Sequence, residues 1–148
     1  MTDDFDTRTK LAIYQALAET ARVPTRVALT KKLGADGSEI ASSLTRLREK
    51  KLVFLARDSG EIVMAPPFSA VPTPFAVVAD GKTFYANCVW DAYGVAAALK
   101  RDAEIRASCG CCGDPMRMAV KDGRPEPTEG VAHFAVPARH WWDDLTFT

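Results

Sequence analysis

The sequence is poor in several features that would assign its class at once. Among its 148 residues there are only two histidines, and Lys plus Arg equals Asp plus Glu at 19 each. Because there is no basic excess, the composition does not favour nucleic acid as a partner. No apolar run approaches the ~20 residues of a membrane-spanning helix, so no membrane span is expected. The acidic start, residues 1–6, is unlike a secretory signal, and a cytoplasmic location is therefore expected.

Cysteine is scarce as well, at four residues: Cys88, Cys109, Cys111 and Cys112. In the cytosol these are expected to be thiols, metal ligands or catalytic groups rather than structural disulfides. The rest of the composition, 47% hydrophobic and 26% charged, is typical of a soluble globular protein of one ordinary domain or two very small ones.

The N-terminal part predicts three helices followed by a hairpin. Apolar residues recur at helical spacing in residues 7–21, 25–33 and 38–50. Two β-rich runs, residues 52–56 and 61–64, then flank a glycine turn. This order predicts a winged helix-turn-helix-like part over residues 1–65.

A DNA-binding role for this part is not favoured. Residues 1–70 hold 11 Lys or Arg and 9 Asp or Glu. The third helix gathers its basic residues at its C-terminal end, whereas a recognition helix usually reads bases near its N-terminal half. A structural or dimer-forming role is favoured over operator binding, and a homodimer is an open alternative.

The C-terminal part predicts a small β-sheet domain. A proline-rich linker, residues 66–75, is expected to pack through Phe68, Val71 and Phe75. Residues 76–148 then predict a mixed β-sheet with one or two helices, including a hairpin around Asp80-Gly81. The expected strands and helix lie at 75–78, 83–86, 92–100, 105–108, 116–120 and 131–136. The whole chain is thus predicted to be α+β.

The candidate catalytic pair is Cys88 and Asp91. Cys88 falls where a strand gives way to a helix, and a thiol at a helix N-terminus is favoured as a thiolate by the helix dipole. Asp91 lies one turn on, on the same side of the helix. A nucleophile and a proton carrier could share one pocket there. The structural alternative is a small buried cysteine and a helix-capping aspartate.

The turn from Cys109 to Cys112 is the second candidate site. Three thiols in four residues can bind a soft or borderline metal, although no second cysteine pair completes a zinc site. A redox-active turn and a plain glycine turn are the alternatives. The aromatic residues expected to line a pocket are Tyr85, Trp90, Trp141 and Trp142.

Several of these residues resemble the alkylmercury (organomercurial) lyase family. Residues 85–92, Tyr-Ala-Asn-Cys-Val-Trp-Asp-Ala, resemble that family's Tyr-Ala-x-Cys-x-x-Asp pattern. Cys109 with Gly113-Asp114-Pro115 is similar to its Cys-x-x-x-Gly-x-Pro turn. The closing residues 142–147 resemble the segment that approaches the family's second active-site cysteine.

The resemblance implies a reaction and roles for the residues. Cys88 would bind the mercury of an R–Hg compound, Asp91 would protonate the leaving carbon, and Cys109 would match a structural cysteine. No cofactor is implied, and Hg(II) or another soft metal would be product or ligand. The N-terminal part would belong to the fold rather than to DNA binding.

One departure from the family pattern bears on this reaction. The family's second catalytic cysteine falls near residues 141–144 or just beyond Thr148, and residues 141–148 contain no cysteine. A divergent member without that cysteine is therefore expected, in which either Cys111 or Cys112 substitutes for it or lyase activity is absent. A truncated chain is the other interpretation.

Two alternatives to carbon–mercury cleavage remain open. One is a non-enzymatic soft-metal or thiol sensor, such as a transcriptional regulator that acts through the Cys109–Cys112 turn. The other is a family relative that acts on a different small molecule. The expected partner is a small-molecule organometal or thiol substrate.

Overall fold

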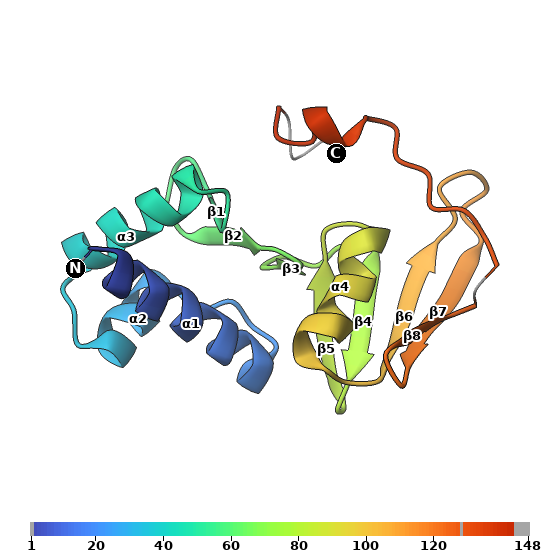
Figure 1. Ribbon diagram of the computed structural model, residues 1–148, viewed down its shortest axis with the longest axis horizontal. Helices are drawn as coiled ribbons and strands as arrows, with labels where there is room; N and C mark the ends of the chain where they lie inside the picture. Colours follow the sequence, from blue (N-terminus) through green and yellow to red (C-terminus); the bar gives the residue numbers. More distant parts are fainter. Residues whose placement is uncertain (1, 128, 144–148) are drawn as a thin grey trace.

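Helices fill the N-terminal part of the chain and one antiparallel sheet runs through the rest (Figure 1). The computed structural model describes residues 2–127 and 129–143. The elements in chain order are α1 Thr2–Thr20, α2 Arg26–Leu33, α3 Gly37–Glu49, β1 Phe54–Leu55, β2 Ile62–Ala65, β3 Phe68–Ser69, β4 Phe75–Ala79, β5 Lys82–Ala86, α4 Val89–Leu99, β6 Ala103–Ser108, β7 Pro115–Lys121, β8 Arg124–Glu126 and the 3₁₀ turn η1 Ala138–His140.

The three N-terminal helices begin and end where local side-chain chemistry predicts. Thr25 caps α2, its hydroxyl accepting the Ala28 N–H at 3.2 Å, and Gly34 ends that helix in the left-handed region at φ 63°. Asp36 and Glu39 form a capping box at the start of α3. The three-helix order followed by the β1–β2 hairpin is confirmed, while kinship with winged helices remains a prediction.

Asp6 links α1 to α3 from a buried position. Its carboxylate, 3% exposed, accepts hydrogen bonds from the Ser43 hydroxyl at 2.7 Å and from the Arg46 guanidinium at 2.8 and 2.9 Å. The Arg46 hydrogen bond outweighs burial and lowers the pKa of Asp6. Nearby, the exposed Asp3 pairs with Lys50 at 2.8 Å. Two of the basic residues at the end of α3 therefore bind α1.

Replacing Asp6 with asparagine should lower the free energy of unfolding by about 1–3 kcal/mol near neutral pH, because a buried charge-assisted network is broken. The Asp6 pKa is lowered in the folded state. Its contribution is thus present above the unfolded pKa of about 3.9 and lost as pH falls through the folded pKa. Urea unfolding should show the two proteins converging in acid. Asp3→Asn is the matched control and should change stability much less; an equal loss in both would contradict the assignment.

The sheet has eight strands in the order β1-β2-β3-β5-β4-β6-β7-β8. The α+β class is confirmed, but the expectation of a mixed sheet is wrong: all seven pairings among the described residues are antiparallel. The hairpin at Asp80-Gly81 is confirmed, with φ values of 49° and 71° at these residues. Strand β3 lies inside the expected linker and pairs with both β2 and β5, so this segment continues the sheet.

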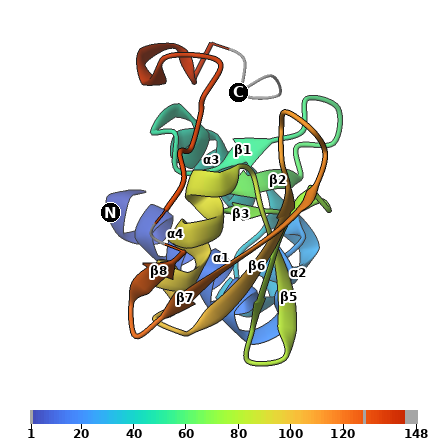
Figure 2. The same cartoon turned by 90° about the vertical axis from the view of Figure 1, so that its right-hand side faces the viewer.

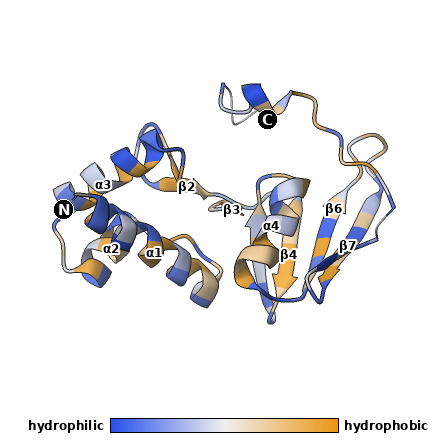
Figure 3. Cartoon of the chain, viewed as in Figure 1, coloured by the Kyte–Doolittle hydropathy of each residue, from blue (hydrophilic) through white to orange (hydrophobic). Residues whose placement is uncertain are grey.

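Helix α4 covers one face of β4, β5 and β6 (Figures 1 and 2). Alternation along the strands turns Val77, Phe84 and Ile105 to this face, where each is at most 2% exposed. The hydropathy of the residues agrees with this packing, since β4 is among the most hydrophobic strands (Figure 3). Gly94 of α4 lies so near Pro67 that an added Cβ would approach the Pro67 Cβ at 3.1 Å. Close packing thus positions the helix that carries the candidate site.

The expected strand at 131–136 is wrong. These residues have no regular structure, and Val131 is 93% exposed, because the segment leaves the sheet after β8. It runs back over the molecule toward β1, where Trp142 stacks on Phe54 with ring centroids 5.6 Å apart (Figure 1). Strand β8 itself was not anticipated. The resemblance noted for residues 144–147 lies outside the described residues.

Among the described helices, none combines the length and apolar character needed to cross a membrane.

Candidate functional site

Cys88 is the N-cap residue of α4. The chain leaves β5 at Ala86 and turns into the helix through an extended Cys88, at φ −152° and ψ −179°. The Cys88 Sγ accepts a hydrogen bond from the Asp91 N–H at 3.5 Å. The strand-to-helix junction predicted from sequence is thereby confirmed, and it places the thiol over the first turn of the helix.

Asp91 is half-buried in that first turn and is held by Asn87. The Asn87 Nδ2 donates to the Asp91 Oδ2 at 3.0 Å. Burial raises the pKa of the Asp91 carboxyl, and the Asn87 hydrogen bond offsets only part of this. A carboxyl with a raised pKa retains its proton to higher pH, which is the property required of a general acid.

The expectation that the helix N-terminus makes Cys88 a thiolate is wrong in direction. Burial raises the pKa of the Cys88 thiol above its usual value. The N–H groups of Asp91 and Trp90 lower it, but the negative charge of Asp91 acts with burial. The cost of burying the Cys88 thiolate therefore exceeds the stabilisation that the N-terminus of α4 gives it.

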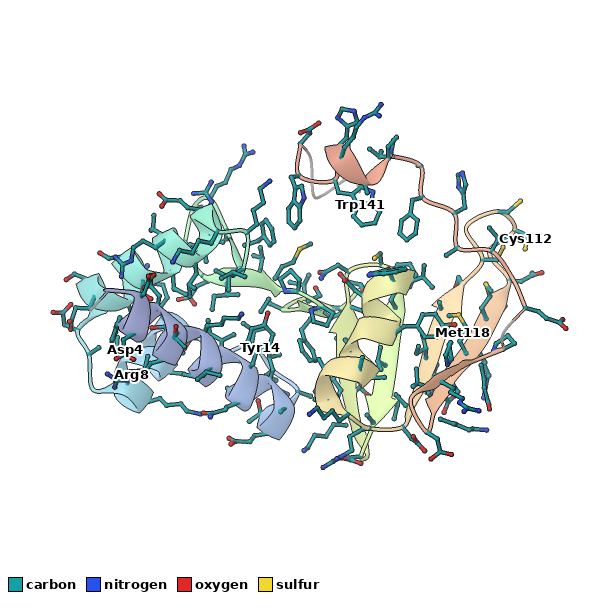
Figure 4. The ribbon with its side chains drawn as sticks, in the orientation of Figure 1. Asp4, Arg8, Tyr14, Cys112, Met118 and Trp141 are labelled. Carbon is teal, nitrogen blue, oxygen red and sulfur yellow. The ribbon has the colours of Figure 1, made fainter. Side chains whose placement is uncertain are left out.

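Two residues near Asp91 were missed by sequence reasoning. Tyr14 of α1 donates to the Pro66 carbonyl at 2.7 Å, and its pKa is raised by burial and then by the Asp91 charge. Figure 4 shows its position between α1 and the sheet. Asn87 buries its Oδ1, which has no hydrogen-bond partner within the described part of the chain. Asn87 lies inside the recognised motif, whereas Tyr14 had no signal beyond its helical spacing.

The cysteine-rich turn closes the β6–β7 hairpin, and Figure 4 shows Cys112 at its tip. The Cys109 N–H donates to the Asp114 carbonyl at 2.8 Å, and the Gly113 N–H donates to the Cys109 carbonyl at 2.9 Å. Hydrogen bonds from the N–H groups of Cys112 and Cys111, and from the Cys112 thiol, lower the pKa of Cys109. The Cys109 thiol in this turn therefore ionises more readily than an ordinary cysteine, while Cys111 and Cys112 are exposed.

The turn lies at the same end of the sheet as Cys88 but apart from it. Strands β5 and β6 both run antiparallel to β4, so Cys88 and Cys109 follow strand ends that point the same way. Because β4 lies between β5 and β6, these two strand ends are two strand spacings apart, or about 10 Å. Across residues 2–127 and 129–143, no three His, Cys, Asp or Glu side chains gather into a metal site. This arrangement therefore gives no support to the expectation that Cys111 or Cys112 replaces the family's second cysteine beside Cys88.

The four aromatic residues expected to line a pocket are scattered. Tyr85 alternates with Phe84 and Ala86, which puts it on the sheet face opposite α4. Trp90 is 67% exposed on the first turn of α4. Trp141 packs on Phe134, with ring centroids 5.0 Å apart, within the returning segment. Pocket lining stays a prediction for all four.

Two hollows in the described part of the molecule lie away from Cys88 and Asp91. A small cavity at the opposite end of the sheet is lined by Ala18, Asp80, Lys82 and Arg101, among others. A shallow hollow lies over β6, β7 and β8. The candidate site is defined by its thiol and carboxyl rather than by either hollow.

Cys109 should react with iodoacetamide faster than Cys88 near neutral pH. The Cys109 pKa is lowered and the Cys88 pKa is raised, so a larger fraction of Cys109 is thiolate. Mass-spectrometric mapping at short reaction times measures both in one sample. Unfolding the protein in urea serves as the control, because it should remove the difference. A faster reaction at Cys88 in the folded protein would contradict the pKa directions.

Comparison with known proteins adds to this geometry. Residues 68–148 match the family described as MerB, alkylmercury lyase. A solved structure of the mercury-bound form of MerB2 is similar in fold, with a TM-score of 0.63 and 20% identity over 79% of this chain. The match spans 57% of the MerB2 chain, little more than half its length. No curated protein matches the sequence.

Proposed function

Since this chain belongs to the alkylmercury lyase family, we propose that it cleaves carbon–mercury bonds by protonolysis. The observation that carries the proposal is the pairing of Cys88 and Asp91 on the first turn of α4, with the Cys88 Sγ 3.5 Å from the Asp91 N. Mercury as substrate requires a soft ligand, and the carbon that departs requires a proton. Cys88 supplies the soft ligand, and Asp91 supplies the proton.

In the first step Cys88 binds the organomercurial. The thiol loses its proton, an S–Hg bond forms, and the ligand previously bound to mercury leaves with that proton. Mercury is soft and prefers sulfur to oxygen or nitrogen donors. The raised pKa of Cys88 means that mercury displaces a proton instead of meeting a free thiolate.

In the second step Asp91 protonates the carbon. The Hg–C bond breaks, its electron pair takes the carboxyl proton, and the hydrocarbon leaves while mercury stays on sulfur. The negative carboxylate then lies beside the mercury cation. A second sulfur ligand on mercury, such as an external thiol, weakens the Hg–C bond and later removes Hg(II).

Asn87 positions the acid, and Tyr14 lies within reach of its charge. The Asn87 amide orients the Asp91 Oδ2, and its buried Oδ1 offers an acceptor beside the reacting groups. Tyr14 is fixed by its hydrogen bond to Pro66. Burial keeps the Asp91 pKa raised, and the half-buried Tyr14 brings α1 within reach of the Asp91 charge.

The test is incubation with phenylmercury or methylmercury in excess thiol, with benzene or methane measured by gas chromatography. Hydrocarbon should accumulate over many turnovers per chain. The chain with Cys88 selectively replaced retains three cysteines and controls for cleavage by surface thiols. Binding of the mercurial at Cys88 without hydrocarbon release over hours would refute the proposal and favour a different small-molecule substrate.

The regulator alternative is less well supported by α3. Arg46 and Lys50 pair with α1, and Lys51 lies over the Trp142 ring at 4.9 Å. Basic side chains engaged within the molecule are less available for phosphate contacts.

A further inference from the structure

The side-chain amide of Asn87 is only half paired, although it lies beside the acid. Its Nδ2 donates to the Asp91 Oδ2 at 3.0 Å. Its Oδ1 is buried and has no hydrogen-bond partner among residues 2–127 and 129–143. A buried acceptor without a donor lowers stability, and in a native protein it calls for an explanation. Within those ranges, the hydrogen bond to Asp91 is the interaction that sets the direction of the amide.

This hydrogen bond makes the two oxygens of the Asp91 carboxyl different. An amide N–H needs a lone pair on its acceptor, and a proton on the same oxygen would compete for that place. While the bond to Asn87 is made, a proton on Asp91 is therefore carried by Oδ1. The titratable groups that sense the Asp91 charge are the Cys88 thiol on α4 and the Tyr14 hydroxyl on α1, and the latter donates to the Pro66 carbonyl.

We propose that Asn87 is a positioning residue that confines the transferable proton of Asp91 to its Oδ1. The catalytic consequence rests on the proposed function. Oδ1 gives its proton to the departing carbon, and Oδ2 stays bonded to Asn87 throughout. Once the proton has left, the Nδ2–H bond becomes charge-assisted and stabilises the carboxylate until solvent returns a proton to Oδ1. The family pattern Tyr-Ala-x-Cys-x-x-Asp leaves position 87 open, so this role belongs to the present chain.

The unpaired Oδ1 of Asn87 indicates that the amide serves the acid at some cost in stability. Leucine has a similar size and leaves no buried acceptor unpaired, and such a replacement can be neutral or stabilising. Because the folded-state pKa of Asp91 is raised, its contribution to stability is full below the unfolded pKa of about 3.9 and is lost as pH rises through the folded pKa. Without the Asn87 donor that loss should be larger.

The experiment compares the parent chain with Asn87→Leu. In the absence of any mercurial, the Asp91 Cγ signal in a ¹³C NMR pH titration should have a higher midpoint in the variant. Urea unfolding should find the variant at least as stable as the parent below that midpoint and less stable above it. With phenylmercury, kcat should fall about 10–100-fold, the value of a hydrogen bond to an ionised group, while KM changes little.

Thr73→Val is the matched control, because it also removes a half-buried polar group near the end of β5. The Thr73 hydroxyl is paired, since it donates to the Ala86 carbonyl. Its loss should lower stability at every pH and leave the Asp91 midpoint unchanged. An Asn87→Leu chain that behaves in the same way would give Asn87 a purely structural role and overturn the proposal.

A measurement on the parent chain needs no variant to fold. One Hδ2 proton of Asn87 should stay hydrogen-bonded to Asp91, downfield in the ¹H–¹⁵N spectrum, on both sides of the Asp91 midpoint. Loss of that bond when Asp91 is protonated would mean that the amide turns and accepts the O–H, which would overturn the proposal. If no hydrocarbon is released, the proposed function fails, yet the NMR and unfolding results still decide the role of Asn87.

Discussion

The Cys88→Ser protein should neither bind an organomercurial at α4 nor release hydrocarbon from it. Serine places a hard, protonated hydroxyl where the proposed mechanism needs a soft sulfur. The hydroxyl can still accept the Asp91 N–H, so the N-cap of α4 and the fold should survive. Loss of activity would then be chemical rather than structural.

Two measurements separate these causes. Circular dichroism and thermal unfolding should match the parent protein, while gas chromatography should find no benzene from phenylmercury. Cys111→Ser, an exposed thiol replaced in the same way, should retain full turnover. Hydrocarbon release from Cys88→Ser at the parent rate would show that another group captures mercury.

Asp91→Asn should bind the mercurial yet turn it over about 10²–10⁴-fold more slowly, the usual contribution of a positioned acid–base group. The amide has the size of the carboxyl, and its oxygen can still accept the hydrogen bond from Asn87. It cannot deliver a proton to carbon. Mass spectrometry should therefore detect the Cys88–Hg–R adduct, which in the parent protein is consumed.

The conservative control is Asp91→Glu, which restores an acid at the cost of geometry and should recover part of the rate. Asn and Glu variants that are equally inactive would mean that position, not proton transfer, limits the reaction. An Asn variant with parent-like turnover would remove Asp91 from the mechanism and leave water or another acid as the proton source.

Local patterns in the sequence were sufficient for the helices, the hairpins and the Cys88–Asp91 juxtaposition. Helix caps such as Thr25 and Asp36 act within three residues, so their effect can be predicted without knowing the fold. The same holds for Asp80-Gly81, whose positive φ values define the turn. Residues 131–136 were wrongly predicted to form a strand because several of them are apolar. Only the tertiary structure shows that this segment leaves the sheet after β8.

The sequence by itself pointed to the family through the resemblance of its motifs. It also predicted the α+β class and the residues proposed for the chemistry, because spacing and periodicity are local properties. The tertiary structure decided the antiparallel sheet, the approach of Tyr14 to Asp91 and the direction of both pKa shifts at the site. Strand pairing and burial depend on residues far apart in the chain. Desolvation by those distant residues exceeds the local effect of the helix N-terminus, and it raises the pKa of both the Cys88 thiol and the Asp91 carboxyl.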